Sequence, residues 1–166
     1  MLTREDLSVT EWRDVRDTPH HVLVAVSSSG GSAFDEMLER KAGLQGVVDA
    51  MHSTHPLLRE IASGSSIMQA QTDVREWYYT LPEAERTPET LRAKALDSMR
   101  LALDAISAHG GPEDRLHYTD FIVALATRVA RAAREGDLFG VGGELISKSE
   151  REIIDQLHAM AKAPTA

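Results

Sequence analysis

The sequence contains no cysteine among its 166 residues. Disulfide bonds, thiolate metal sites and cysteine nucleophiles are therefore excluded. Aromatic residues make up only 5% of the chain, which argues against the stacking platforms that single-stranded nucleic-acid binders use. No run approaches the roughly 18 consecutive apolar residues of a membrane span. The start has no basic segment followed by an apolar one, so we expect a cytoplasmic protein with no secretory signal and no membrane partner.

Positive charge is also scarce. Lys and Arg number 18 against 26 Asp and Glu, which gives a formal net charge of −8. Proteins that bind the phosphate backbone need a concentrated basic face. The basic residues are scattered, apart from Arg128, Arg131 and Arg134, so we expect no nucleic-acid partner. The acidic balance favours solubility and a surface for cations or basic partners.

Alternation of apolar and polar residues, the pattern of a half-buried strand, is nearly absent. Helical spacing recurs instead along the whole chain, whose length suits one domain. We therefore predict an all-α protein, a single compact bundle of six to seven helices with short connections. Residues 1–17 are expected to form an N-terminal turn or short helix, and residues 163–166 a frayed tail.

Helix starts are marked by residues typical of N-caps. Capping boxes begin at Ser8, Ser32 and Ser147, each with an acidic residue three positions on. Thr18-Pro19 and Thr87-Pro88 place proline at a first helical position, so both predict a helix start. Further boundaries are indicated at His55-Pro56, Ser65 or Ser66, Pro82, Gly110-Gly111-Pro112 and Gly136.

Three long stretches carry an apolar face at helical spacing, and we expect each face to lie in the core. The β-branched run Val22 to Val26 is interpreted as a buried helix rather than a strand. Gly43 and Gly46 weaken their helix and so indicate close packing or a bend. The apolar faces comprise Ile67, Gln71, Val74, Tyr78 and Leu81; Leu96, Met99, Leu103 and Ile106; and Tyr118, Ile122, Leu125, Val129 and Ala133.

A Gly-rich run over residues 137–150 separates the last two predicted helices, and a weaker one covers residues 28–35. When the two are overlaid without gaps, Gly30-Gly31 matches Gly142-Gly143. Each run is followed by an acidic helix start. These acidic residues are Glu36 and Glu39 after the first run, and Glu150 and Glu152 after the second.

The second run resembles a loop of the tellurite-resistance B-type (TerB-like) proteins, which are compact all-helical bacterial domains. Their pattern is an apolar helix, an Asp-Gly turn, an Ile-Ser step and a Glu that heads the next helix. Ile146, Ser147 and Glu150 match this pattern, whereas Gly143 and Glu144 stand where the Asp-Gly pair falls. The resemblance implies an all-helical fold, acidic loop residues that meet a divalent cation, and a role in stress response or protein association.

Several reactive motifs are missing. The glycines at 140–143 lack the Gly-Lys-Ser/Thr ending of a phosphate-binding loop. An EF-hand register with Ile146 at position eight puts Phe139, Val141 and Gly143 at ligand positions without side-chain oxygens, which rules out calcium binding of that type. No Gly-x-Ser-x-Gly elbow occurs. We therefore predict no catalytic residues.

A metal site remains the alternative hypothesis. Asp114 and His117, and likewise Asp155 and His158, place a carboxylate and an imidazole one helical turn apart. Helix-bundle metal centres use comparable pairs on facing helices. These four residues are thus candidate ligands of a divalent metal in a metal-binding module or metal-dependent enzyme, with Glu150 as a further candidate.

Trp77-Tyr78-Tyr79 is the densest aromatic patch. Tyr78 continues an apolar face, whereas Trp77 and Tyr79 either pack beneath a loop or form an exposed contact surface. Because no catalytic constellation is complete, we interpret the chain as non-enzymatic, acting by association with a protein partner or with a second copy of itself. The last alternative is a small-molecule pocket lined by Met37, Met51, Met68 and Met99.

Overall fold

The computed structural model describes residues 1–30, 32–63, 66–135 and 146–162. Within these ranges the chain forms seven α-helices, three short 3-10 helices and no strand, which confirms the all-α prediction. The Gly-rich residues 136–145 and the tail at 163–166 lie outside the described residues. The α-helices are α1 (Val9–Ser27), α2 (Ala33–Asp49), α3 (Pro56–Ala62), α4 (Ile67–Thr80), α5 (Pro88–His109), α6 (Pro112–Glu135) and α7 (Lys148–Lys162).

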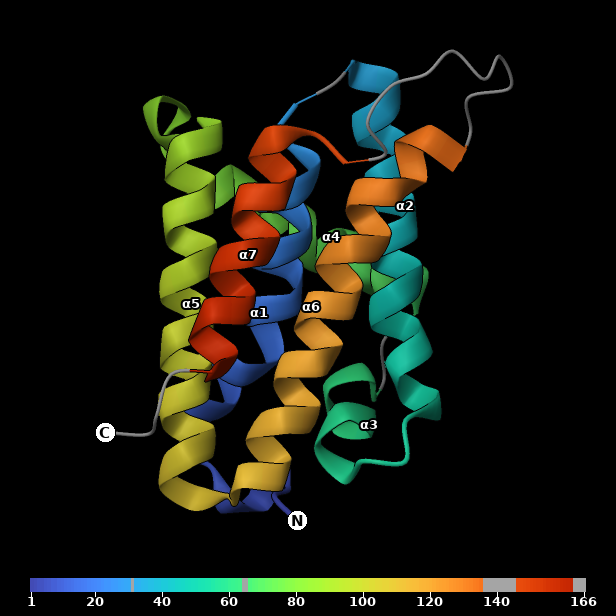
Figure 1. Ribbon diagram of the computed structural model, residues 1–166. Coiled ribbons are helices and arrows are strands. Elements are labelled where there is room, and N and C mark those ends of the chain that lie inside the picture. The colour runs from blue at the N-terminus through green and yellow to red at the C-terminus, as the bar shows by residue number, and fades with distance from the viewer. Residues whose placement is uncertain (31, 64–65, 136–145, 163–166) are drawn as a thin grey trace.

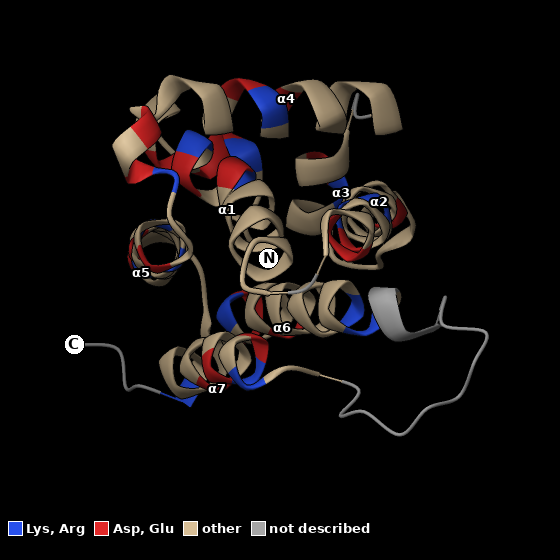
Figure 2. Ribbon diagram, turned by 90° about the horizontal axis from the view of Figure 1, so that it is seen from above, with Lys and Arg blue, Asp and Glu red and all other residues tan. Residues whose placement is uncertain are grey.

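Helix α1 lies in the middle of the bundle (Figure 1). In the end-on view of Figure 2, α5 lies on one side of α1 and α2 on the other, α6 and α7 lie below it, and α4 crosses above it. The most extensive packing joins α1 to α5 and α2 to α6. The predicted buried helix at Val22 to Val26 is confirmed, because all five residues have 0% exposure. Among the described helices, none has the length and apolar character that crossing a membrane requires.

The prediction of a helix start at Thr18-Pro19 is wrong, because α1 runs unbroken through both residues and includes most of residues 1–17. Pro19 removes the N–H that would donate to the carbonyl of Val15, one turn earlier. That carbonyl instead accepts a 2.8 Å hydrogen bond from the Tyr118 hydroxyl of α6. The Thr18 hydroxyl donates back to the carbonyl of Asp14. The hydrogen bond from Tyr118 therefore lets the helix continue through Pro19, although the Thr18-Pro19 pair by itself favours a helix start.

The capping boxes predicted at Ser8, Ser32 and Ser147 are all present. Each serine hydroxyl accepts from the backbone N–H three residues on, and the acidic side chain there accepts from the serine N–H. Ser66 and Thr87 cap α4 and α5 through their hydroxyls. These helix starts follow from local sequence alone.

Close packing, rather than a bend, explains the glycines of α2. A Cβ atom at Gly43 would lie 2.9 Å from a methyl of Val129 and 3.0 Å from one of Leu23. At Gly46 it would lie 2.7 Å from a methyl of Leu125. The missing side chains let α2 approach α6, and at Gly43 also α1.

The predicted apolar face of α4 is only partly buried, whereas most described residues of the α5 and α6 faces are buried. Ala70 and Val74 reach the core, but Ile67 remains 44% exposed, Gln71 is exposed and Tyr78 is half-buried. The reason is that α4 packs mainly across α1 and α2, and none of the other described helices covers its outer side. By contrast, the core contains Met99, Leu103, Ile106, Tyr118, Ile122, Leu125 and Val129. Leu96 of α5 is half-buried, and the side chain of Ala133 lies outside the described residues.

Candidate functional site

The structure divides the candidate metal ligands between two surroundings. Asp114 is buried in the first turn of α6, and His117 follows one turn later, half-buried. Asp155 and His158 are exposed on α7. In the part of the chain that the structure describes, no three His, Cys, Asp or Glu side chains group as a metal ion requires. The two Asp/His pairs are therefore not assembled into one centre.

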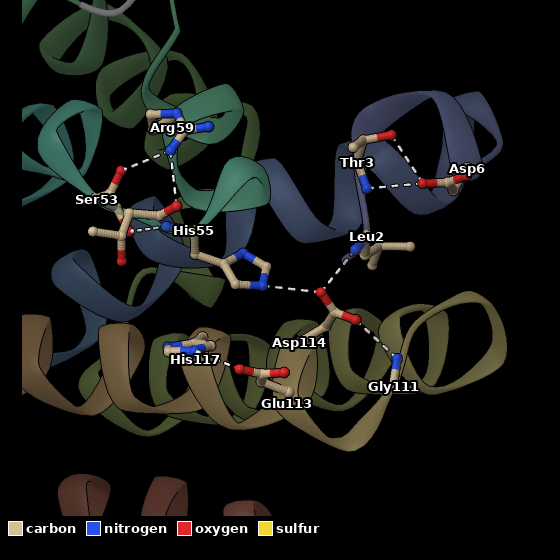
Figure 3. A network of polar contacts seen from close by, with 11 residues as sticks. Leu2, Thr3, Asp6, Ser53, His55, Arg59, Gly111, Glu113, Asp114 and His117 are labelled. Atoms are coloured by element: carbon tan, nitrogen blue, oxygen red, sulfur yellow. Dashed lines mark hydrogen bonds and ion pairs between the residues drawn. The ribbon is translucent and has the colours of Figure 1, made fainter.

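Asp114 instead anchors a polar network at the base of the bundle (Figure 3). One of its oxygens accepts from the Leu2 N–H at 2.7 Å and lies 2.9 Å from His55 Nε2. The other accepts from the Gly111 N–H at 2.9 Å. The His55 and His117 rings lie 4.9 Å apart in a tilted arrangement. Asp114 thus fastens the N-terminal residues, the start of α3 and the α5–α6 turn to one another.

The electrostatics of Asp114 fit a structural role. Burial disfavours its charged form, but the N–H groups of Gly111 and Leu2 outweigh that effect and hold the pKa of Asp114 below its ordinary value. Both oxygens are already hydrogen-bonded within the protein. We interpret this carboxylate as an anchor of the fold.

A second buried contact joins two carboxyl groups, Glu39 of α2 and Glu150 of α7. Their exposed fractions are 3% and 4%. Glu150 accepts from the Ser147 N–H at 2.6 Å and is hydrogen-bonded to Glu39, whose Oε2 is buried without a partner. Burial, followed by the charge of Glu150 and the hydrogen bond to it, raises the pKa of Glu39 to about 8. The raised pKa favours the protonated form of the Glu39 carboxyl at neutral pH, which can donate to Glu150.

Trp77 and Tyr79 lie in different surroundings. Trp77 is half-buried and stacks on His21 with ring centroids 4.1 Å apart. The His21 Nδ1 lies 2.5 Å from Ser98 Oγ, and burial lowers the pKa of His21 to about 4. Such a weakly basic imidazole is poorly suited to activating a hydroxyl at neutral pH. Tyr79 is 61% exposed, with the guanidinium of Arg86 5.1 Å from its ring centre.

Tyr79 lines a groove of about 500 Å³ between α2 and α4. Large apolar side chains stay exposed there: Met37 is 55% exposed and Ile67 is 44% exposed. Leu44 and Val74 close the floor and are buried. Because α4 crosses α2 rather than running along it (Figure 2), the two helices diverge and leave this space open.

Basic side chains accompany the apolar walls of this α2–α4 groove. Arg40, Lys41 and Arg75 line it together with one carboxylate, Glu36. Arg40 donates to Glu36 at 2.5 Å, yet its buried Nε has no acceptor. The Arg75 guanidinium lies 5.9 Å from the ring centre of Tyr79. The groove therefore combines apolar surface with local positive charge.

Another hollow, of about 420 Å³, lies beside α5 and α7. Its arginine, Arg92, already bonds Glu152 at 2.9 Å and Gln156 at 3.0 Å. The charge of this hollow is thus neutralised within the protein. We regard the α2–α4 groove as the stronger candidate site.

The four methionines do not line one pocket. Met99 is fully buried in the core, and only Met37 belongs to the α2–α4 groove. Met51 and Met68 are 40% and 79% exposed. The methionine-lined pocket is therefore not formed by the described residues.

The sequence identified Tyr79 as a contact candidate, but the prediction that Ile67 and Gln71 lie in the core is wrong, because both are exposed. Sequence reasoning also overlooked Arg40. One available signal was Gln71, a polar residue in the middle of an apolar face. A polar residue at that position indicates that the face is not fully covered.

Comparison of the chain with protein-family models, with curated proteins and with solved structures gives no match in any of the three. The resemblance to TerB-like proteins stays a prediction based on the residues around Ser147.

Proposed function

We propose that this chain acts by protein association and that its α2–α4 groove receives a helical segment of a partner protein. The observation that carries the proposal is the gathering of exposed Met37, Ile67 and Tyr79 along one groove. Contiguous exposed apolar surface marks interaction sites in folded proteins. Methionine suits such a surface because its flexible, polarizable side chain adapts to a partner.

The dimensions of the groove support a helical occupant. Ile67 and Tyr79 lie on its α4 wall at positions 12 residues apart, a distance of about 18 Å at 1.5 Å per residue. This length matches about three turns of a docked helix. A helix satisfies its own backbone, so a groove walled by side chains needs to supply only side-chain contacts.

A non-enzymatic role is consistent with the polar clusters described above. Asp114 is bonded to three groups of the fold, and Glu39 is bonded to Glu150. Neither cluster borders the groove. A role in stress response, which the TerB-like resemblance implies, forms part of the same proposal.

Site-specific photocrosslinking in the producing cells tests this proposal. The photoreactive residue p-benzoylphenylalanine replaces Gln71 on the groove wall, and the matched control replaces Leu116, which is 57% exposed on α6. We expect a discrete adduct from position 71 alone, and its loss when Met37→Asp is added. Mass spectrometry then separates a different protein from a second copy of this chain.

Met37 is exposed, so Met37→Asp should retain the helical circular dichroism of the wild type. The proposal fails if position 71 yields no adduct beyond those of position 116. It also fails if the adduct persists in the folded Met37→Asp variant.

A further inference from the structure

We propose that the helix received by the α2–α4 groove is acidic, with carboxylates placed to meet Arg40, Lys41 and Arg75. This inference rests on the proposed function and adds the chemical character of the partner. It concerns charge, whereas the association itself rests on the apolar walls.

The charge of the groove runs against the charge of the chain. Three cationic side chains and one carboxylate line it, a formal balance of +2, whereas the whole chain carries −8. Several basic residues elsewhere on the surface are tied to acidic ones, as in the Arg100 contacts with Asp97 and Asp104. A locally positive groove on an acidic protein attracts acidic segments and repels basic ones.

Arg40 provides a specific point of recognition. Its Nη2 donates to Glu36, and its guanidinium lies 5.4 Å from the ring centre of Tyr78. The buried Nε has no acceptor, although a guanidinium carries five N–H donors in a planar fork. This arrangement leaves the guanidinium under-bonded, and a carboxylate from a docked helix would supply further acceptors.

The cations flank the apolar strip on both walls. On α2, Arg40 and Lys41 follow Met37 by one turn, and on α4, Arg75 precedes Tyr79 by one turn. Among the described residues, Lys41 has no ion partner. A helix with an apolar face bordered by Asp or Glu on both edges therefore complements the groove along its length.

A peptide-display selection against the full chain tests this inference. The library presents an 18-residue helix with leucine fixed at positions i, i+3 and i+7 and with the flanking positions randomised. Three targets are used: the wild type, the Lys41→Glu/Arg75→Glu variant, and a control, Lys148→Glu/Arg151→Glu. The control makes the same change in net charge on α7, where both residues are exposed.

We expect peptides bound by the wild type and by the control to be enriched in Asp and Glu beside the leucines. On Lys41→Glu/Arg75→Glu the enrichment should turn to Lys and Arg. A selected acidic peptide should bind this groove variant at least tenfold more weakly than the wild type, and should bind the control within threefold of the wild type.

The possible failures separate the two proposals. The inference about charge is overturned if the peptides that bind in the groove show no acidic bias. It is also overturned if they show the same acidic bias on Lys41→Glu/Arg75→Glu as on the wild type. Either result leaves the proposal of association standing. If no enriched peptide loses binding to Met37→Asp, both the inference and the proposed docking function are overturned.

Discussion

The hydroxyl of Tyr118 donates a 2.8 Å hydrogen bond to the carbonyl of Val15, the acceptor that Pro19 deprives of its helical N–H. Both residues have 0% exposure. Burial raises the pKa of Tyr118 above its ordinary value, which keeps the phenol protonated as a donor. A side chain of α6 thereby completes the backbone bonding of α1.

Removal of this hydroxyl should leave a buried carbonyl without a donor. We expect Tyr118→Phe to lower the free energy of unfolding by about 1–3 kcal/mol, measured by urea titration. In a Pro19→Ala background the new N–H can bond Val15, so the same substitution should cost much less. Equal costs in the two backgrounds would contradict this account, and a double-mutant cycle gives the difference directly.

Asp114 should be a point of acid sensitivity. We expect Asp114→Ala, which leaves Leu2, Gly111 and His55 without their acceptor, to lower the free energy of unfolding by about 2–4 kcal/mol at pH 7. The folded-state pKa lies below the ordinary 3.8. The stabilisation by the charged form is therefore complete above the ordinary value and is lost as pH falls through the folded value.

The milder variant Asp114→Asn tests that pH dependence. In urea titrations, the free energy of unfolding of Asp114→Asn should be lower than that of the wild type by a constant amount between pH 7 and pH 5. This difference should shrink toward pH 3. A deficit that is the same at all three pH values would show that the charge of Asp114 does not contribute.

Glu39 should produce the opposite pH dependence. Its pKa rises from 4.5 to about 8 on folding, so the native chain binds the proton more tightly than the unfolded chain. The associated stability is complete below 4.5, declines as pH rises and levels off above about 8. Glu39→Gln cannot ionise and still offers a donor to Glu150.

We therefore expect Glu39→Gln to gain stability relative to the wild type between pH 5 and pH 8, reaching about 1–3 kcal/mol at pH 8. Urea titrations at pH 5, 6.5 and 8 measure the gain, with exposed Glu89→Gln as the control. A difference that does not grow with pH, or that grows equally in the control, would refute the raised pKa of Glu39.

The two glycines of α2 should respond differently to alanine. At Gly43 the new Cβ would lie 3.1 Å from the Cβ of Leu23, an atom that no rotamer change can move. We expect Gly43→Ala to cost about 1–3 kcal/mol despite its better helix propensity. At Gly46 the closest atom is the end of the flexible Leu125 side chain. Thermal melts should therefore show little change in stability for Gly46→Ala. A larger loss of stability for Gly46→Ala than for Gly43→Ala would contradict the packing argument.

Features of the fold were predictable from the sequence where the deciding interaction is local. The boxes at Ser32 and Ser147 bond residues three positions apart, so the sequence displays both partners. Pro19 misled the prediction because its compensating donor lies 103 positions away from Val15. Glu39 and Glu150 each resemble an ordinary acid at a helix start, and only the folded chain brings the two together in the interior.

The candidate site was harder to predict for a related reason. Helical spacing at Ile67 and Val74 shows that α4 has an apolar face, but it does not show which element covers that face. Tyr79 could be identified as a contact candidate because it belongs to the aromatic patch Trp77-Tyr78-Tyr79. The free donor of Arg40 follows from its position between Glu36 and the wall of the groove, which no linear pattern displays.

The central position of α1 has a consequence for biosynthesis. A ribosome that adds 5–20 residues per second takes roughly 4–16 s to pass from the end of α1 at Ser27 to the end of α5 at His109. During that interval the apolar surface of α1 is present in the nascent chain, but α5, its most extensive packing partner, has not yet been made. The innermost helix of the finished protein is therefore the first whose apolar surface must be covered, either by a chaperone or by the ribosome.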